Sequence, residues 1–301
     1  MKSSHRLTLG LLISVLGLVA ADAAEREENL VYKTTAEGEA LRLLVNYPAD
    51  WQVTDHRPAV ILFRGGGWTS GSYTGFSQHT DELASRGLVV FRIEYRLLKK
   101  KESQIPSVCT QDARSAMHYV RAHAARFGVD PEQIISMGGS AGGQLAAAVA
   151  IENGWDDDQD DLSVSPQPQA MVLFNPVLDL IGEMEKRGVT LFEAHRFQLG
   201  LISPYEHVDH STPPCVIFFG KEDKLLPHGV NFSQRASQFD VRSDLHLYAG
   251  VGHTFWRRAG FDHELIYVLD EFLADSRSTA KSHCSGNSPD VLGKRGLTDW
   301  S

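Results

Sequence analysis

Residues 133–150, QIISMGGSAGGQLAAAVA, are the stretch that decides the fold. The apolar run at 133–137 is typical of a short buried strand, and the small apolar residues from 141 onward are typical of a helix. Between them, Ser140 has two glycines on each side. Because glycine permits sharp turns that side chains would block, this stretch predicts a strand that passes abruptly into a helix, which should stop near Gly154.

Other short apolar runs along the chain resemble the run before Ser140. They are rich in Val, Ile, Leu and Phe, as the strands of a buried parallel sheet are. The runs occupy residues 59–63, 88–95, 133–137, 170–174, 215–219 and 245–248. Helical periodicity lies between most of them, most clearly at 107–127, where apolar residues fall three or four apart and Gly128 follows as a stop.

The segment before these runs has a different pattern. Residues 30–34 and 41–47 flank Glu37 and Gly38, which predicts an antiparallel hairpin. The hairpin and the six later strands together predict an α/β fold, an eight-stranded, mostly parallel sheet with helices on both faces. We expect the long connection at 180–214 to be an excursion over the top of the sheet.

Length and composition narrow the class of protein. The chain has 301 residues, of which 42% are hydrophobic, so it can bury a sizeable core, and a disordered or fibrous protein is excluded. Its formal net charge is -9, and it has no long basic block. A nucleic acid is therefore not an expected partner.

The amino-terminal residues read as a signal peptide. Lys2 and Arg6 precede an apolar run at 7–20, and the small residues Ala21 and Ala23 follow it, which predicts a signal peptide at 1–23 with cleavage after Ala23. A retained anchor is the alternative. The run is short for a membrane span, so we expect a secreted or periplasmic protein without a stable span after cleavage. After the signal peptide, the sequence predicts a single domain at 24–277 and a polar, flexible tail at 278–301.

The cysteines do not form a disulfide framework. Cys109, Cys215 and Cys284 are odd in number and widely spaced, with no C-x-x-C pair. The first two lie in apolar segments and are predicted to be small core residues, whereas the third lies in the tail.

The turns that follow the strands carry residues suited to nucleophilic catalysis. Ligands of an open parallel sheet bind at the carboxyl ends of its strands, and Ser140 lies there within a G-x-S-x-G motif. A serine hydroxyl is a poor nucleophile at neutral pH and needs a base and a carboxylate. His253, in a glycine-flanked turn after the last strand, is the candidate base. Asp223, after the preceding strand, is the favoured acid over Glu222 and Asp179.

Backbone amides near Ser140 provide a second element of this chemistry. Gly65, Gly66, Gly67 and Trp68 follow the strand at 59–63, and glycines let their N–H groups approach a substrate oxygen without obstruction. The amide of Ala141 supplies another donor at the start of a helix. The alternative, a turn that cradles phosphate, lacks the Lys and Ser/Thr of a P-loop.

Two further features have less specific patterns. The acidic run at 156–161 is expected to be a solvated, self-repelling loop; its spacing departs from an EF-hand because Asp161 occupies the glycine position and Gln167 the place of the bidentate glutamate. Neither a metal nor a cofactor is predicted. Trp68 and Phe255 are candidate substrate-binding residues, since they lie in loops at the carboxyl end of the sheet.

Over roughly residues 30–274 the chain resembles the α/β-hydrolases of the hormone-sensitive-lipase-like and carbohydrate-esterase-like (acetyl xylan esterase-like) group. In that group a His-Gly-Gly-Gly motif precedes the nucleophile and the triad order is Ser, Asp, His. The resemblance implies that residues 24–277 form the catalytic domain. It implies a nucleophile, an acid, a base and an oxyanion hole at Ser140, Asp223, His253 and the amides of Gly66, Gly67 and Ala141.

The sequence departs from the group at Arg64, which stands where the group usually has histidine. One interpretation is that the guanidinium braces the loop through carbonyl or carboxylate contacts. The other is that its permanent charge favours an acidic or polyhydroxy substrate.

The resemblance implies a serine carboxylic-ester hydrolase that acts through an acyl-enzyme on small-molecule or carbohydrate esters, with acetylated carbohydrates as candidates. A prolyl-oligopeptidase-type exopeptidase would share the triad and fold, although no large gating domain is predicted here. A non-catalytic, hydrolase-like binding protein is a third possibility, but it would be expected to lack a member of the triad.

Overall fold

A computed structural model describes residues 27–74, 77–99, 105–151, 155–188, 191–257, 267–269 and 271–272. The predicted signal peptide at 1–23, the tail at 278–301 and Cys284 lie outside these residues, as do the limits of the predicted domain at 24–277. None of the described helices combines the length and apolarity needed to cross a bilayer.

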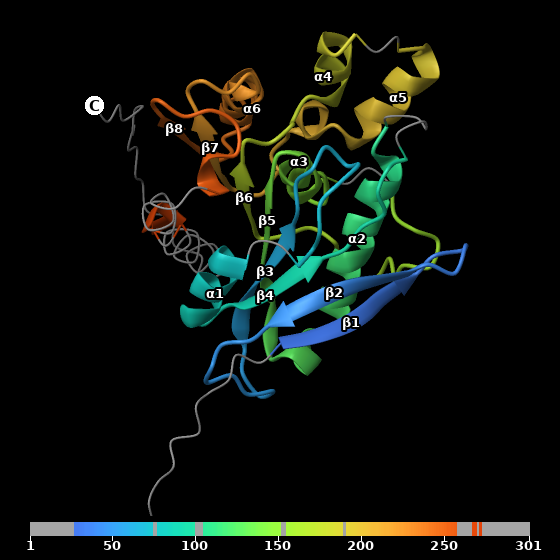
Figure 1. Cartoon of the computed structure of the whole chain (residues 1–301), viewed down its shortest axis with the longest axis vertical. Helices are drawn as coiled ribbons and strands as arrows, with labels where there is room; N and C mark the ends of the chain where they lie inside the picture. Colours follow the sequence, from blue (N-terminus) through green and yellow to red (C-terminus); the bar gives the residue numbers. More distant parts are fainter. Residues whose placement is uncertain are drawn as a thin grey trace, which may run out of the picture.

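The sheet confirms the predicted fold class. Its eight strands are β1 (Glu27–Thr34), β2 (Ala40–Asn46), β3 (Arg57–Phe63), β4 (Val89–Ile93), β5 (Val129–Gly139), β6 (Ala170–Phe174), β7 (Cys215–Gly220) and β8 (Ser243–Tyr248). They lie in the order β1-β2-β4-β3-β5-β6-β7-β8 (Figure 1). The hairpin strand β2 pairs antiparallel with both β1 and β4, and the other pairs are parallel.

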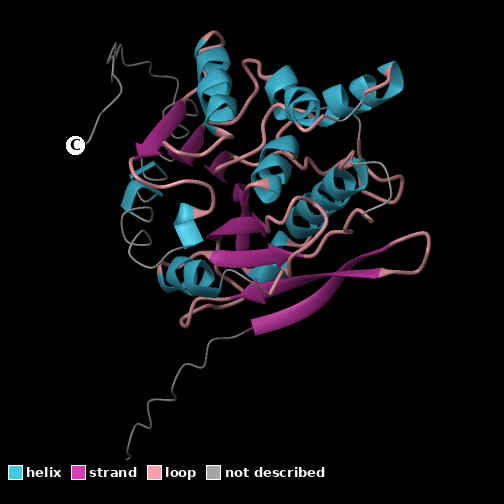
Figure 2. Ribbon diagram, turned by 45° about the horizontal axis from the view of Figure 1, so that its top comes forward, coloured by secondary structure: helices cyan, strands magenta, loops and turns pink. Residues whose placement is uncertain are grey.

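Helices cover both faces of the sheet (Figure 2). They are α1 (Ser77–Ser85), α2 (Ser107–Ala122), α3 (Ala141–Ala148), α4 (Leu180–Lys186), α5 (Glu193–Ile202) and α6 (Leu226–Ser237), with short 3-10 turns η1 (Ala124–Phe127), η2 (Pro204–His207) and η3 (Phe255–Arg257). Alternate residues of each strand point to opposite faces. In β3, Ile61 and Phe63 therefore pack in one core cluster with α2 and α3, whereas Val60 and Leu62 pack in a second cluster with α1.

Two helices are shorter than the sequence predicts. Helix α2 ends at Ala122, and the chain continues as η1 until Gly128, whose φ of 61° ends the turn. Helix α3 ends at Ala148 instead of near Gly154. The Arg114 guanidinium of α2 donates a hydrogen bond to the carbonyl of Ile151 at 2.6 Å, which draws the chain towards α2. Cys109 and Cys215 are fully buried, as predicted.

The excursion between β6 and β7 consists of α4, α5 and η2. Figure 1 shows α4 and α5 at the top of the molecule, beyond α3. The excursion is attached to the body of the protein at the end of α5, because the carbonyl of Ile202 accepts a hydrogen bond from the Gln144 side chain of α3 at 3.1 Å.

The strand register brings the residues after several strands together. Phe63 of β3 pairs with Gly138 of β5, and Gly139 pairs with Phe174 of β6. The chain continues this alignment beyond the strands, since the amide of Ser140 donates to the carbonyl of Phe174 at 2.8 Å. The turns after β3, β5, β6 and β7 therefore meet at one edge of the sheet, as parallel topology requires.

Candidate active site

Ser140 occupies a strained turn between β5 and α3. Its φ of 57° and ψ of -119° lie in a region that residues with side chains rarely adopt. The glycines around it are required by close packing. A Cβ at Gly138 would lie 2.2 Å from the carbonyl oxygen of Gly142, and a Cβ at Gly142 would lie 2.1 Å from that of Phe63. The steric role predicted for these glycines is confirmed.

Ser140, His253 and Asp223 form one continuous hydrogen-bonded relay. The Nε2 atom of His253 lies 2.9 Å from Ser140 Oγ, although the two residues are 113 positions apart in the chain. The Nδ1 atom of the same ring lies 2.8 Å from Asp223 Oδ2. The His253 side chain is 38% exposed and the Asp223 side chain 2% exposed, so the carboxylate is sealed behind a ring that solvent reaches.

The structure distinguishes the three acidic candidates. The carboxylate of Asp179 caps α4, where it accepts from the amide of Gly182 at 2.8 Å. The carboxylate of Asp223 contacts His253, whereas no hydrogen bond within the described residues joins that ring to Glu222 or Asp179. The predicted order of preference is therefore the one that the geometry favours.

Asp223 is held in its ionised form. Burial alone would raise the pKa of its carboxyl group, but hydrogen bonds from His253 and from the amide of Leu225, the latter at 2.9 Å, keep this pKa below its usual value. An ionised carboxylate at this position favours the imidazole tautomer that carries its proton on Nδ1. Nε2 is then free to accept the proton of Ser140 Oγ.

Asn175 is a further member of the site that the sequence analysis missed. It directly follows β6, is fully buried and has a φ of 45°. Its side-chain Nδ2 donates a hydrogen bond to Asp223 Oδ2, so it helps to fix the carboxylate. Its position in the sequence could have pointed to it, because this Asn directly follows a buried strand, at the edge of the sheet where Ser140 and Asp223 also lie.

The loop after β3 lies against the turn at Ser140. A Cβ at Gly65 would come within 2.7 Å of the Gly139 carbonyl oxygen and 3.4 Å of Ser140 Cβ. Gly66 and Gly67 have φ values of 124° and 59°, which glycine adopts without strain. The carbonyl of Gly66 closes the loop, because it accepts hydrogen bonds from the Ser70 amide at 3.1 Å and from Ser70 Oγ at 2.9 Å.

The amides expected to face a substrate oxygen are not used elsewhere in the described part of the chain. None of the described residues accepts a hydrogen bond from the N–H groups of Gly66, Gly67 or Ala141. Ala141 is the first residue of α3, where helix geometry leaves the N–H groups without intrahelical acceptors and gives them a partial positive charge. These three amides are thus available to bind an anionic oxygen.

Arg64 braces the loop. Its guanidinium is buried, with the residue 4% exposed, and it donates to the carbonyl oxygens of Ser70 and, at 3.4 Å, of Tyr95. It also stacks over the Tyr95 ring at 4.3 Å. The first interpretation of the exchange from histidine is therefore supported. Selection of an acidic or polyhydroxy substrate would need an exposed guanidinium, which the structure does not provide.

The two aromatic residues expected to line the substrate site are in the core. Trp68 is 2% exposed and Phe255 is fully buried. The indole N–H of Trp68 donates to Gln144 Oε1 at 3.0 Å, and Phe255 packs against Tyr248 with 5.0 Å between ring centroids. This corrects the expectation that they form a substrate-facing wall, since loop position alone does not show which way a side chain turns.

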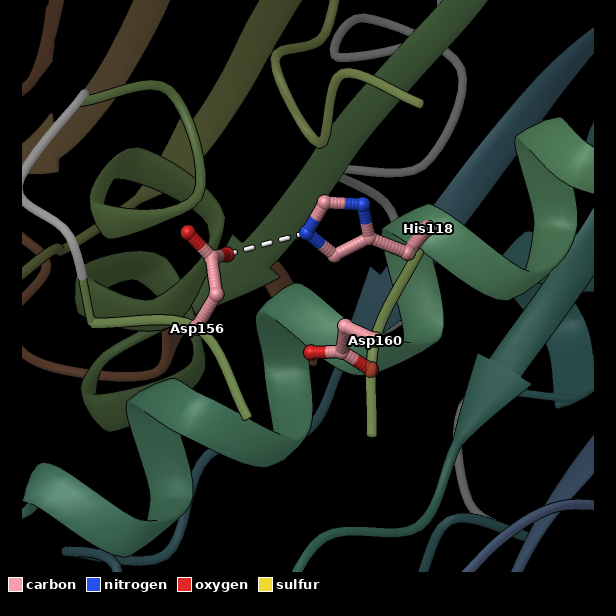
Figure 3. Close-up of side chains that lie close together, drawn as sticks. All are labelled: His118, Asp156 and Asp160. Carbon is pink, nitrogen blue, oxygen red and sulfur yellow. Dashed lines mark hydrogen bonds and ion pairs between the residues drawn. The ribbon is translucent and has the colours of Figure 1, made fainter. Parts of the chain in front are cut away.

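The first two aspartates of the acidic loop are paired with basic residues, whereas Asp158 and Asp161 are exposed. Asp156 accepts hydrogen bonds from Arg114 at 2.6 and 3.0 Å and contacts His118 Nε2 at 2.9 Å (Figure 3). Lys33 forms an ion pair with Asp157 at 2.7 Å. The expectation of a solvated, self-repelling loop is therefore wrong for Asp156 and Asp157, whose charges are balanced by basic residues from α2 and β1.

The same cluster contains the atoms of a possible cation site. One ligand atom each from His118, Asp156 and Asp160 lies within 4.8 Å of the other two. Both oxygens of Asp156 already bind the guanidinium of Arg114, and Asp160 Oδ2 accepts from Ser115 Oγ at 2.9 Å. The second ring nitrogen of His118 points away from the two carboxylates (Figure 3). The arrangement is an ion-pair network that attaches the loop to α2.

Comparisons with known proteins show which family the chain belongs to. A family model described as BD-FAE matches residues 47–235. The apo form of Thermogutta terrifontis esterase 2 is 34% identical, with a TM-score of 0.73 over 82% of this chain and 94% of that one. The same esterase has been solved with propionate bound, at a TM-score of 0.75 and 32% identity, over 85% of this chain and 96% of that one.

Two curated relatives extend the comparison. A probable isoprenylcysteine alpha-carbonyl methylesterase of Arabidopsis thaliana is 26% identical over 74% of this chain and 52% of its own length. An acetylxylan esterase of Xylanibacter ruminicola is 25% identical over 76% of this chain and 49% of its own length. The chain thus spans about half the length of these relatives.

Proposed function

Because the chain belongs to the BD-FAE family and has the α/β-hydrolase fold, we propose that it is a serine carboxylic-ester hydrolase that works through an acyl-enzyme. The observation that carries this proposal is the relay from Ser140 Oγ through His253 to the buried Asp223, with distances of 2.9 and 2.8 Å. The hydroxyl proton of Ser140 can therefore pass to His253 Nε2 without rearrangement of the side chains, while Asp223 stays ionised.

In the first step, Ser140 Oγ attacks the ester carbonyl carbon while His253 Nε2 takes the hydroxyl proton. The resulting imidazolium is stabilised by the ionised carboxylate of Asp223, and it returns the proton to the leaving alcohol as the carbon–oxygen bond breaks. Water then attacks the acyl carbon while His253 takes its proton, and the imidazolium returns that proton to Ser140 Oγ as the bond between the acyl carbon and Oγ breaks and the acid leaves.

The negative oxygen of each tetrahedral intermediate needs fixed donors. We assign this role to the amides of Gly66 and Gly67, in the loop whose Gly65 lies against Ser140, and of Ala141, the residue after Ser140; none of the three has an acceptor among the described residues. Removal of one such donor costs roughly 10²- to 10³-fold in kcat in comparable enzymes. These amides therefore carry a substantial share of the proposed rate enhancement.

The proposed substrates are esters with small acyl groups, including acetylated carbohydrates. Two observations on related proteins support a small acyl group: one relative is named an acetylxylan esterase, and the Thermogutta esterase has been solved with propionate bound. The acetylxylan name also supports a carbohydrate as the alcohol part.

The test is active-site labelling combined with a substrate series. A fluorophosphonate should modify Ser140 of the purified protein, and Ser140→Ala should lose the label and about 10⁶-fold in kcat, with little change in unfolding temperature. Nitrophenyl acetate and butyrate should be hydrolysed faster than long-chain esters. Full turnover by Ser140→Ala would refute the proposal.

Two results would favour the alternatives. Cleavage of a dipeptide anilide with no hydrolysis of esters would favour the exopeptidase. Correctly folded protein that takes no label and hydrolyses neither class of substrate would favour the binding protein.

We also propose that the protein is exported. The support is the charged and then apolar pattern of residues 1–23, which lie outside the described part of the structure. Amino-terminal sequencing of material from the medium or periplasm should find a chain that begins at Ala24. An intact chain that begins at Met1 in the membrane fraction would instead support a retained anchor.

A further inference from the structure

Gln144 is a fully buried polar residue one helical turn after Ser140. Its backbone N–H donates to the carbonyl of Ser140 at 3.1 Å. Its side-chain Oε1 accepts from the indole of Trp68 at 3.0 Å, and its Nε2 donates to the carbonyl of Ile202 at 3.1 Å. A longer contact of 3.4 Å joins Nε2 to Thr110 Oγ1. Every polar group of this side chain therefore has a partner.

These bonds link segments that are far apart in the sequence. Trp68 belongs to the loop after β3, Gln144 to α3, and Ile202 to the end of α5. The bond to Trp68 crosses 76 positions, and the bond to Ile202 crosses 58. A buried amide is expensive unless all its hydrogen bonds are made, so the side chain holds these segments in one arrangement.

The proposed oxyanion hole is divided between two of these segments. The amides of Gly66 and Gly67 come from the loop after β3, and the amide of Ala141 comes from α3. Trp68 is the next residue after the loop glycines, and its φ of 62° is one that residues with side chains rarely adopt. The carbonyl of Trp68 is also fixed, because it accepts from the Leu98 amide at 2.9 Å.

We propose that Gln144 is a positioning residue that sets the separation between the two halves of the oxyanion hole through its bond to Trp68. The inference rests on the proposed esterase function and adds a residue that does not touch the substrate. A displacement of donors by about 1 Å can cost 10²-fold in rate. A side chain that fixes both halves of the oxyanion hole therefore affects how strongly the amides stabilise the transition state.

Gln144→Met tests the inference, because methionine has a similar length and shape but neither hydrogen-bonding group. We expect kcat for nitrophenyl acetate to fall about 10- to 100-fold while KM changes less than about 3-fold, since the charge on the substrate oxygen develops only in the transition state. Trp68→Phe removes the indole N–H from the other side and should give a fall of similar size.

The double variant distinguishes a shared bond from two separate losses. If both substitutions act through the Trp68–Gln144 bond, Gln144→Met combined with Trp68→Phe should be no slower than the slower single variant. Effects on kcat that multiply would overturn the inference. Trp68→Phe also serves as an independent test if Gln144→Met fails to fold.

Ser136→Ala is the matched control for lost stability. Ser136 Oγ is buried and donates to the carbonyl of Ala146 at 2.7 Å, so this change also removes a buried bond to α3, but towards the helix end that lies away from Ser140. It should lower the unfolding temperature and leave kcat within about 2-fold of the parent. If Gln144→Met behaves in the same way, Gln144 has only a structural role.

A spectroscopic measurement tests the bond without turnover. The indole N–H resonance of Trp68, identified by its disappearance in Trp68→Phe, should shift and exchange faster with solvent in Gln144→Met but not in Ser136→Ala. An unchanged resonance would overturn the inference. An active wild-type enzyme with an equally active Gln144→Met would refute this inference alone, whereas an inactive wild type would refute the proposed function as well.

Discussion

Two histidine–aspartate pairs in this protein have nearly the same contact distance. His253 Nδ1 lies 2.8 Å from Asp223 Oδ2, and His118 Nε2 lies 2.9 Å from Asp156 Oδ1. In both pairs burial would raise the pKa of the carboxyl group, but hydrogen bonds hold it below its usual value. Distance and carboxylate ionisation therefore do not distinguish the catalytic candidate from the other pair.

The surroundings of the two rings differ. The second nitrogen of His253 meets Ser140 Oγ, and the side chain is 38% exposed. The second nitrogen of His118 is buried with no hydrogen-bond partner among the described residues, and the side chain is 5% exposed. Asp156 also accepts hydrogen bonds from Nε and Nη2 of the Arg114 guanidinium. A histidine–carboxylate pair becomes a candidate base only where its other nitrogen meets a reacting group that a substrate can reach.

Replacing each histidine by alanine is the strongest way to test this contrast. His253→Ala should lower kcat for nitrophenyl acetate about 10⁵- to 10⁶-fold, because Ser140 loses its proton acceptor, while the protein remains folded. His118→Ala should keep kcat within about 2-fold and lower the unfolding temperature. Steady-state kinetics and thermal unfolding of both variants measure these effects. Equal losses of activity in the two variants would show that the His253 and His118 pairs do not differ in function.

The two aspartates give the next largest difference. Asp223→Asn should lower kcat about 10⁴-fold, because an amide favours the wrong tautomer of His253 and cannot stabilise the imidazolium. Asp156→Asn should leave kcat unchanged. The same kinetic assay decides, and a fall in kcat for Asp156→Asn of more than about 10-fold would mean that the second pair also serves catalysis.

The sequence was sufficient to predict that Ser140, His253 and Asp223 lie together, because their convergence follows from their positions after the strands. Parallel strands bring their carboxyl ends to one edge, so residues in the turns after successive strands had to converge, and Ser140 and His253 could be found from those turns alone. The glycines at 138–143 added the steric signal for the strained serine. The eight-stranded sheet followed from apolar runs whose length and composition are typical of buried strands.

Features that depend on contacts between distant segments could not be predicted in this way. Trp68 looked like a substrate-facing residue from its loop position, but its indole is turned inward by Gln144. Asp156 looked solvated from its acidic neighbours, but Arg114, 42 positions earlier, neutralises it. Asn175 had no motif of its own. In each case the partner is set by how helices and loops dock, which local periodicity does not encode.

A third prediction uses the pH dependence of the Asp156 pair. A carboxyl group whose pKa is lowered by folding stabilises the protein above its unfolded pKa, about 3.9, and this contribution is lost as the pH falls through the lower folded value. Asp156→Asn should therefore lower the free energy of unfolding at pH 7 by about 1 kcal/mol, a modest loss because the pair is partly screened by solvent.

Denaturant unfolding from pH 7 down to pH 3 measures this difference. The gap between the wild type and Asp156→Asn should narrow as the pH drops below about 4, because the unfolded chain takes up the proton first and the folded carboxyl group does so at lower pH. A gap that stays constant with pH would show that the loss comes from packing and not from the charge that Arg114 neutralises.

The smallest expected effect has the opposite sign and lies in the same cluster. Burial raises the pKa of Asp160 despite its hydrogen bonds from Ser115 and from the Asp157 amide, so folding disfavours its charged form. Such a group contributes most below its unfolded pKa and loses that contribution as the pH rises through the folded value. Asp160→Asn keeps an acceptor for both donors and removes the charge. It should therefore raise the free energy of unfolding at pH 7 by about 0.5 kcal/mol or leave it unchanged, and the difference should vanish near pH 3.

This small effect also tests what the second pair is for. If His118, Asp156 and Asp160 bound a divalent cation, calcium or zinc would stabilise the wild type, a chelator would reverse the gain, and Asp160→Asn would lose it. Denaturant unfolding with and without each metal separates the two cases. Because Arg114 already occupies Asp156, we expect no metal-dependent shift. The pair near Ser140 would then differ from the pair on α2 in purpose as well as in surroundings, since the first is proposed to transfer a proton and the second attaches a loop to the helix.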